Sequence, residues 1–340
     1  MIDELLSNFW VLLVLKVIII AAVIPGAGLL IGFAELKLSA KMQNRVGPYF
    51  AGGRWGWAQL LADGIKFFQK EDLIPAEADR AVFKMAPMLV FIGTVALFVV
   101  IPFSPTLVVQ DLDIGIFYAL AISSISTIGV LVAGWSSANK YSLMGGLRAA
   151  GQLIAYELPL VLSVVGVVVM AGTMSLNGIV DAQAGWFSEL GWQGGMPFII
   201  PQFIGFVIFM IAALAELSRI PFDMPIAESE LVMGYVTEYS GFRFLFFFLA
   251  EFSNMFSMSA IAATLFLGGY WAPFVPDSVL TYAGPLILVS KVFILVFLMI
   301  WFRWTFPRFR EDQLQTLAWK WLIPLSIANI IVTGIFKVVF

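Results

Sequence analysis

The sequence is dominated by uninterrupted apolar runs, and a run of about 20 residues is long enough to cross a bilayer as a helix. We place eight of them, near 10–34, 80–103, 114–134, 152–173, 197–217, 241–268, 281–302 and 321–340. Only 12% of the 340 residues are charged, whereas a soluble domain is roughly a quarter charged. We therefore predict an all-α, polytopic integral membrane protein, with residues 1–340 forming a single transmembrane domain.

The chain contains neither cysteine nor histidine. It cannot supply thiolates to an iron-sulfur cluster or an axial imidazole to a haem. A Ser-His or Cys-His nucleophile and a His-based zinc site are excluded for the same reason. We therefore expect no metal site and no redox centre in this chain.

Lysine and arginine concentrate in every second connection between the predicted spans, and short cytoplasmic loops carry such an excess. Eight of the 19 basic residues belong to the first loop region, and eight more are Lys140, Arg148, Arg219, Arg243, Arg303, Arg308, Arg310 and Lys320. The alternate connections carry acids instead, such as Asp111, Asp113 and Asp181. This pattern predicts cytoplasmic basic loops and two outward termini.

Inside the first loop, one set of residues recurs at helical spacing: Trp57, Leu61, Gly64, Ile65 and Phe68. Asp63, Lys66 and Lys70 share the other face. We predict an amphipathic helix that lies in the membrane interface. A solvated loop helix is the alternative, because Gly56 and Gly64 each weaken a helix by about 1 kcal/mol.

Three acids stand in apolar surroundings: Glu157, Glu216 and Glu251. A carboxylate at the bilayer centre costs roughly 2.5–3.5 kcal/mol, so it usually faces a protein or water-filled interior and marks a pathway. The alternative for each is an acid at the interface that reaches water or pairs with arginine. Arg219 follows Glu216 by three residues, and this spacing on one helical face predicts an ion pair.

The segment 216–243 crowds five acids and two arginines around Pro221 and Pro225. Crowding and partial burial raise the pKa of a carboxyl group, so some acids of this loop are expected to titrate near neutral pH. A proton relay needs such groups, although a solvated acidic loop would show the same composition. The charged residues are Glu216, Arg219, Asp223, Glu228, Glu230, Glu238 and Arg243.

Several longer motifs resemble one known family. They are KMQNRVGP at 41–48, LADGIK at 61–66, KEDLIP at 70–75, LRAAGQLIAYELP at 147–159, RIPFDMP at 219–225, AESELV at 227–232, TEYSG at 237–241 and PRFREDQL at 307–314. Together they resemble the family of quinone-site membrane subunits of NADH-quinone oxidoreductase, respiratory complex I. The likeness extends from residue 35 to about residue 325.

The resemblance implies a membrane subunit that helps to enclose a quinone cavity where the membrane arm meets the peripheral arm. Quinone would be a substrate at a shared site, whereas flavin and iron-sulfur clusters would be carried by peripheral partner subunits. Antiporter-like subunits would be further partners. On general expectation, and from no particular residue, we place the chain in a bacterial plasma membrane. The implied quinone-cavity residues are Glu35, Arg45 and Asp63; Trp57 and Phe68 are apolar enough to border an isoprenoid tail, although aromatic residues at interfaces are more often anchors. The implied proton-coupling residues are Glu157, Glu216, Arg219, Asp223, Glu228, Glu230 and Glu251.

Two positions depart from the family pattern. Leu36 stands where the family usually has arginine, and Ile226 stands where it often has an acid. The two changes either compensate each other or mark a branch with a different quinone or electron donor. Two other functions stay open: a secondary transporter, which also buries acids and proline-broken helices but usually shows internal repeats, and a membrane anchor of a related hydrogenase or other donor:quinone oxidoreductase.

Overall fold

The computed structural model describes residues 9–186, 195–273 and 275–339. All regular secondary structure in these ranges is helical, which confirms the predicted all-α class. The helices are α2 (Phe9–Met42), α3 (Gln59–Gln69), α4 (Arg80–Leu97), α5 (Gly115–Ser136), α6 (Lys140–Ala171), α7 (Leu176–Ala184), α8 (Phe203–Glu216), α9 (Glu228–Leu231), η1 (Gly234–Val236), α10 (Gly241–Phe266), α11 (Asp277–Thr305), α12 (Glu311–Thr316), η2 (Leu317–Leu322) and α13 (Ile323–Val339).

Within the described ranges, seven helical segments are long and apolar enough to cross a membrane. The predicted span 197–217 is not among these seven segments, because its helix, α8, has only 14 residues. At 1.5 Å per residue it rises about 21 Å, less than the roughly 30 Å of a bilayer core. Pro197 and Pro201 disfavour helical geometry in the residues before them, and 198–202 form turns instead.

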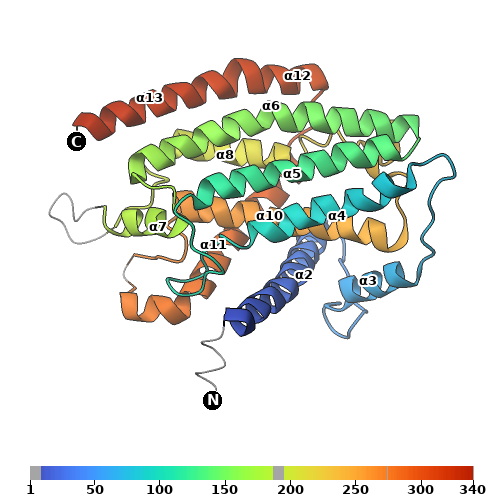
Figure 1. The fold of residues 1–340 in the computed structure, drawn as a ribbon, viewed down its shortest axis with the longest axis horizontal. Coiled ribbons are helices and arrows are strands. Elements are labelled where there is room, and N and C mark those ends of the chain that lie inside the picture. The colour runs from blue at the N-terminus through green and yellow to red at the C-terminus, as the bar shows by residue number, and fades with distance from the viewer. Residues whose placement is uncertain (1–8, 187–194, 274, 340) are drawn as a thin grey trace.

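Two long helices organise the bundle. α6 packs against α5, α8 and α13, and α10 packs against α2, α4 and α11. In Figure 1, α13, α6, α5 and α4 run side by side across the view, with α3 at the right-hand end and α7 at the left-hand end. The first loop and the short helix α7 therefore lie at opposite ends of the molecule.

Glycines permit the closest contacts of α6. A Cβ atom at Gly145 would lie 2.7 Å from both Gly234 Cα and Tyr235 N, and one at Gly134 would lie 2.6 Å from Ser142 O. A side chain at either position would separate α6 from its neighbours. Gly134 thus permits α5 to approach α6 closely, and Gly145 permits the segment around η1 to lie directly against α6, beside the acid-rich loop.

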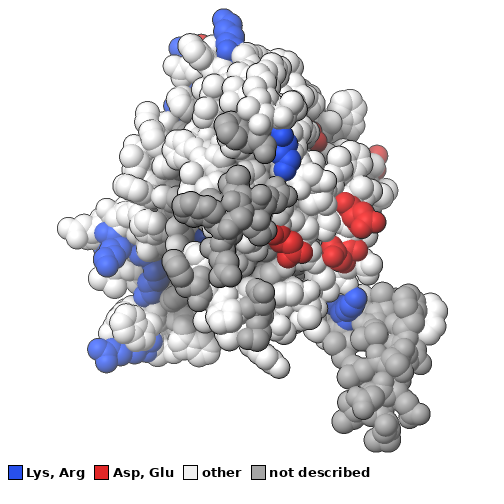
Figure 2. All heavy atoms as spheres, turned by 90° about the vertical axis from the view of Figure 1, so that its left-hand side faces the viewer, with Lys and Arg blue, Asp and Glu red and all other residues white. Residues whose placement is uncertain are grey.

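The left-hand end of the bundle carries a group of acidic side chains, which Figure 2 shows gathered on one side of that face. One acid near α7 is well bonded: Asp111 accepts hydrogen bonds from Ser175 Oγ at 3.2 Å and from Asn177 Nδ2 at 2.9 Å. These bonds fix the loop before α5 to the start of α7.

Candidate functional site

A cavity of about 410 Å³, here called the charged chamber, lies between α2, α10, α11 and the segment 218–236. Seven charged residues line it together with aromatic side chains from α10 and α11. Since isolated charges are costly to bury, such a lining indicates that the charges are paired or reach water. The charged lining residues are Glu35, Arg45, Arg219, Asp223, Glu228, Glu251 and Arg303.

Two arginines and two glutamates form a paired set on one wall of the chamber. Arg219 Nη1 donates to both carboxylate oxygens of Glu35 at 3.0 Å, and Glu35 also pairs with Arg303. Arg219 Nη2 lies 3.2 Å from a carboxylate oxygen of Glu251. Glu35 is 6% exposed and Arg219 is 7% exposed. The four side chains balance each other's charge, and pairing with arginine accounts for the position of Glu251.

The ring of Phe252 supports this set from α10, with its centroid 4.7 Å from the Arg219 guanidinium carbon. A guanidinium at this distance from an aromatic face is held by a cation–π interaction. Trp304 follows Arg303, and its Nε1 donates to Ser39 Oγ at 2.8 Å. These contacts tie α11 and α10 to the end of α2, where Glu35 lies.

Asp223 is a further acid of the chamber and lies in the loop after α8. Burial raises its pKa to about 6, Glu251 reinforces this rise, and Arg308 opposes it. Asp223 can therefore exchange a proton near neutral pH. Glu228 also lines the chamber but is exposed. The prediction of an acid with a raised pKa in this loop holds for Asp223.

Glu230 behaves differently from Asp223. Its carboxylate accepts a hydrogen bond from Arg148 Nη1 at 2.8 Å and lies 3.4 Å from Arg308 Nη2. The Arg148 hydrogen bond and the charge of Arg308 lower the pKa of Glu230. It is half exposed and is not among the residues that line the chamber. Its carboxylate therefore links α6, α9 and the loop before α12 as an ion-pair partner.

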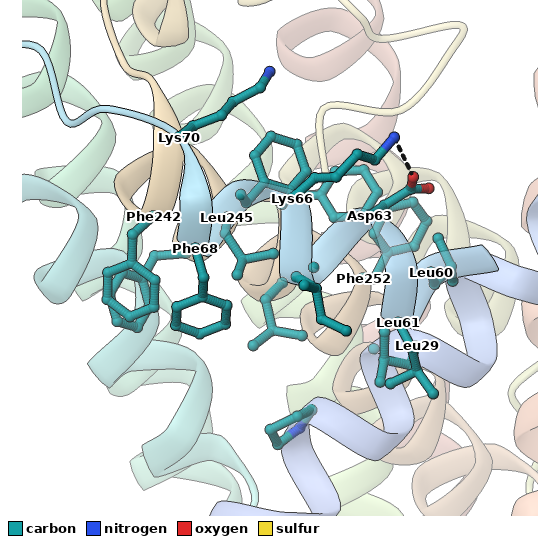
Figure 3. A pocket seen from close by; sticks show the side chains of 18 residues that line it. Leu29, Leu60, Leu61, Asp63, Lys66, Phe68, Lys70, Phe242, Leu245 and Phe252 are labelled. Carbon is teal, nitrogen blue, oxygen red and sulfur yellow. Dashed lines mark ion pairs between the residues drawn. The ribbon is translucent and has the colours of Figure 1, made fainter. Parts of the chain in front are cut away.

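A second cavity of about 570 Å³, here called the apolar slot, lies between α3, α2 and α10. Figure 3 shows Leu61 and Phe68 pointing from α3 toward the apolar side chains of the slot, while Lys66 and Asp63, which also belong to its lining, pair with each other at its edge. Phe68 also packs against Phe242, with ring centroids 4.8 Å apart. α3 is thus the amphipathic wall of an apolar cavity.

The slot and the chamber share three lining residues, Leu60, Phe248 and Phe252. Leu60 comes from the first turn of α3 and is 7% exposed. The slot and the chamber therefore share one apolar boundary, which has mostly apolar side chains on the slot side and paired charges on the chamber side.

The predicted quinone-cavity residues divide between these cavities. Glu35 and Arg45 line the charged chamber, and Asp63 and Phe68 line the apolar slot. Asp63 pairs with Lys66 at 3.1 Å and accepts a hydrogen bond from Gln59 Nε2 at 3.1 Å. Trp57 lies elsewhere: α3 begins two residues after it, so its side chain is not on the apolar face of α3 and lines neither cavity.

The acids Glu157 and Glu216 lie outside both cavities, on α6 and α8. A side-chain hydrogen bond joins Glu216 to Ser123 of α5. The predicted ion pair between Glu216 and Arg219 is wrong. α8 ends at Glu216 and Ser218 adopts φ 51°, so the chain leaves helical geometry and directs Arg219 toward Glu35 and Glu251.

Two important residues were not predicted as site residues. Arg303 was predicted only as a basic loop residue, yet it pairs with Glu35, which is 268 positions away. Gln152 was part of a recognised motif, yet its amide proves to bond the loop that contains Asp223. No spacing rule connects residues so distant in sequence. Among the described residues, no cluster of three or more acidic, histidine or cysteine side chains is placed to hold a metal ion.

The sequence model of the family described as NADH dehydrogenase matches residues 15–334. Two proteins named as NADH-quinone oxidoreductase subunits of the H type, from Bacillus cytotoxicus and Bacillus mycoides, are each 47% identical to this chain. A protein of the same name from Bacillus cereus is 46% identical. Each alignment covers 98% of this chain and 96% of the relative. The chain therefore belongs to the NADH dehydrogenase family and is a membrane subunit of the NADH-quinone oxidoreductase type.

Proposed function

We propose that this chain helps to enclose a quinone-binding cavity and couples quinone reduction to proton translocation. The observation that carries the proposal is the contact between the apolar slot and the charged chamber at Leu60, Phe248 and Phe252. A quinone has an apolar isoprenoid tail and a polar head, and the two cavities match these parts. The tail lies in the slot beneath α3, and the head approaches the chamber.

The acids supply the coupling in this proposal. Reduction of a quinone takes up protons, and a group with a pKa close to the working pH transfers protons most effectively. Asp223 has such a pKa and faces the chamber. Glu216 and Glu157 continue the series of carboxylates into the membrane helices α8 and α6. Each proton taken up beside the quinone changes the charge that these acids experience.

The electrons come from partner subunits, because the sequence offers no thiolate or imidazole ligand. NADH is the donor, and the peripheral arm with its flavin and iron-sulfur clusters docks on the side of the basic loops and α3. Antiporter-like subunits adjoin the membrane helices. We assign the basic loops to the cytoplasmic face of a bacterial plasma membrane and both termini to the outer face.

Leu60→Trp tests the cavity assignment, because it adds bulk at the boundary of slot and chamber. Leu73→Trp is the matched control, since Leu73 is 58% exposed and lines neither cavity. In the complete complex, purified through a tag on this chain, Leu60→Trp should raise the KM for a long-tailed quinone by about tenfold, which equals a loss of about 1.4 kcal/mol. The control should retain the parental KM.

Equal KM values in Leu60→Trp and Leu73→Trp complexes would show that quinone does not pass this boundary. A chain that emerges from gentle detergent without flavin, iron-sulfur signals or quinone reductase activity would contradict the proposal altogether. Proteoliposome uptake would then be the next assay, because a transporter would need no redox partners.

A further inference from the structure

Gln152 lies on α6 inside the motif 147–159 and is 2% exposed. Its Nε2 donates hydrogen bonds to two backbone carbonyl oxygens, Ala215 O at 2.7 Å and Phe222 O at 2.8 Å. Ala215 immediately precedes Glu216, and Phe222 immediately precedes Asp223. One amide group thus bonds to the peptide groups that carry an acid of the membrane helices and an acid of the charged chamber.

This double hydrogen bond fixes the place where α8 ends. The last carbonyls of a helix have no partner within the helix, so they need donors from elsewhere. Ser218 N donates to Ala215 O at 3.1 Å, and Gln152 adds a second, side-chain donor to the same oxygen while its other N–H holds the returning chain at Phe222. The backbone positions of Asp223 and Glu216 are therefore fixed relative to each other, although the chain between them is not helical.

The carbonyl oxygen of the same side-chain amide has no hydrogen-bond donor in the part of the chain that the structure describes. Gln152 Oε1 is buried, and no hydrogen-bond donor among the described residues reaches it. The same is true of Glu216 Oε2. Leaving a buried acceptor unpaired costs about 1–3 kcal/mol, and water usually satisfies such groups in protein interiors. The unpaired oxygens of Gln152 on α6 and Glu216 on α8 therefore indicate a site for bound water.

We propose that Gln152 is a positioning residue that clamps the peptide groups before Glu216 and Asp223 and so holds the two acids for proton transfer along bound water, part of which its Oε1 binds. Asp223 gives one proton to this water, and the water delivers one proton to the Glu216 carboxylate. Asp223 is left ionised, Glu216 is left protonated, the water is restored and no electron moves. The inference rests on the proposed function, since it describes how a proton leaves the quinone chamber.

Gln183 provides a matched control for the structural part of this role. It is 0% exposed, and its Nε2 also donates to two carbonyl oxygens, those of Ile179 at 3.3 Å and Thr264 at 2.9 Å. Its Oε1, in contrast, accepts a hydrogen bond from Phe198 N at 3.0 Å. Gln183 therefore joins α7 to α10 with a fully bonded amide, at the end of the molecule opposite α3.

The experiment compares Gln152→Met with Gln183→Met in the complete complex reconstituted into vesicles. The readouts are the rate of NADH:quinone reduction, the number of protons translocated per electron pair and the thermal midpoint. Both variants should lose thermal stability, because each loses a buried amide clamp. Only Gln152→Met should lower the proton number, by at least about twofold. A purely structural role would lower stability without changing that number.

A parental proton number in Gln152→Met, or an equal decrease in both variants, would overturn the inference. If Gln152→Met does not assemble, Gln152→Glu decides, because it preserves the size of the side chain but replaces the N–H donors. A lowered proton number in Gln152→Glu supports the inference, and a parental number overturns it. A parental complex without quinone-linked proton translocation would instead refute the proposed function.

Discussion

Replacing Glu35 by glutamine should destabilise the chain through the buried charge that it leaves behind. Glutamine keeps the size of the side chain but removes the carboxylate that Arg219 and Arg303 share. Arg219 retains Glu251 as a partner, whereas Arg303 loses the only carboxylate within 4 Å of it in the described part of the chain. Removing one partner of a buried ion pair costs about 3–5 kcal/mol.

The structure places the expected cost at the lower end of this range. The side chain of Arg219 is 8% exposed, but that of Arg303 is 33% exposed, so water can partly solvate the charge that becomes unpaired. We therefore expect a loss of about 3 kcal/mol. At roughly 2 °C per kcal/mol for a chain of this size, the thermal midpoint should fall by about 6 °C.

The assay is thermal unfolding of the detergent-purified chain, followed by intrinsic tryptophan fluorescence. Asp63→Asn is the control, because it removes an ion pair whose lysine side chain is 67% exposed and whose aspartate side chain is 31% exposed. Exposed pairs contribute less than about 1 kcal/mol. A Glu35→Gln midpoint no lower than that of Asp63→Asn would refute the reasoning that the chamber charges are desolvated and mutually dependent.

Two further predictions concern pH and packing. The pKa of Asp223 is raised to about 6, so its contribution to stability is present at low pH and is lost as pH rises through that value. Asp223→Asn should therefore gain thermal stability relative to the parent between about pH 5 and about pH 7.5, and a constant difference would contradict this. Gly145→Ala should prevent stable accumulation of the protein, because the added Cβ would lie 2.7 Å from Gly234 Cα. Gly64→Ala meets no atom within 4 Å and should stabilise α3 by up to about 1 kcal/mol. Expression levels and thermal midpoints of the two variants test this difference.

The long helices could be predicted from sequence because bilayer thickness sets one length for every span. The prediction of a full span at 197–217 was wrong. The apolar run includes Pro197 and Pro201, but helical hydrogen bonding begins only after them. The α3 boundary differed for a related reason. Gly56 precedes Trp57 with a positive φ of 65°, and this conformation separates Trp57 from the helical face that its spacing suggested.

The chamber was only partly predictable. Crowded acids and prolines in 216–243 indicated a titrating loop, and Asp223 has the expected raised pKa. The partners of these acids could not be found by spacing, because Glu35 meets Arg219 and Arg303 across 184 and 268 positions. The local rule that paired Glu216 with Arg219 failed because it assumed a helix beyond the point where α8 ends.

The two departures from the family pattern, Leu36 and Ile226, both line the charged chamber. One missing positive charge and one missing negative charge leave the net charge of the lining unchanged, which favours compensation. The lining contains four acids and three arginines. When all are ionised the lining carries one net negative charge, and it becomes neutral when Asp223 holds a proton. The net charge of this wall therefore depends on a single proton, and the acid that binds this proton has a pKa of about 6.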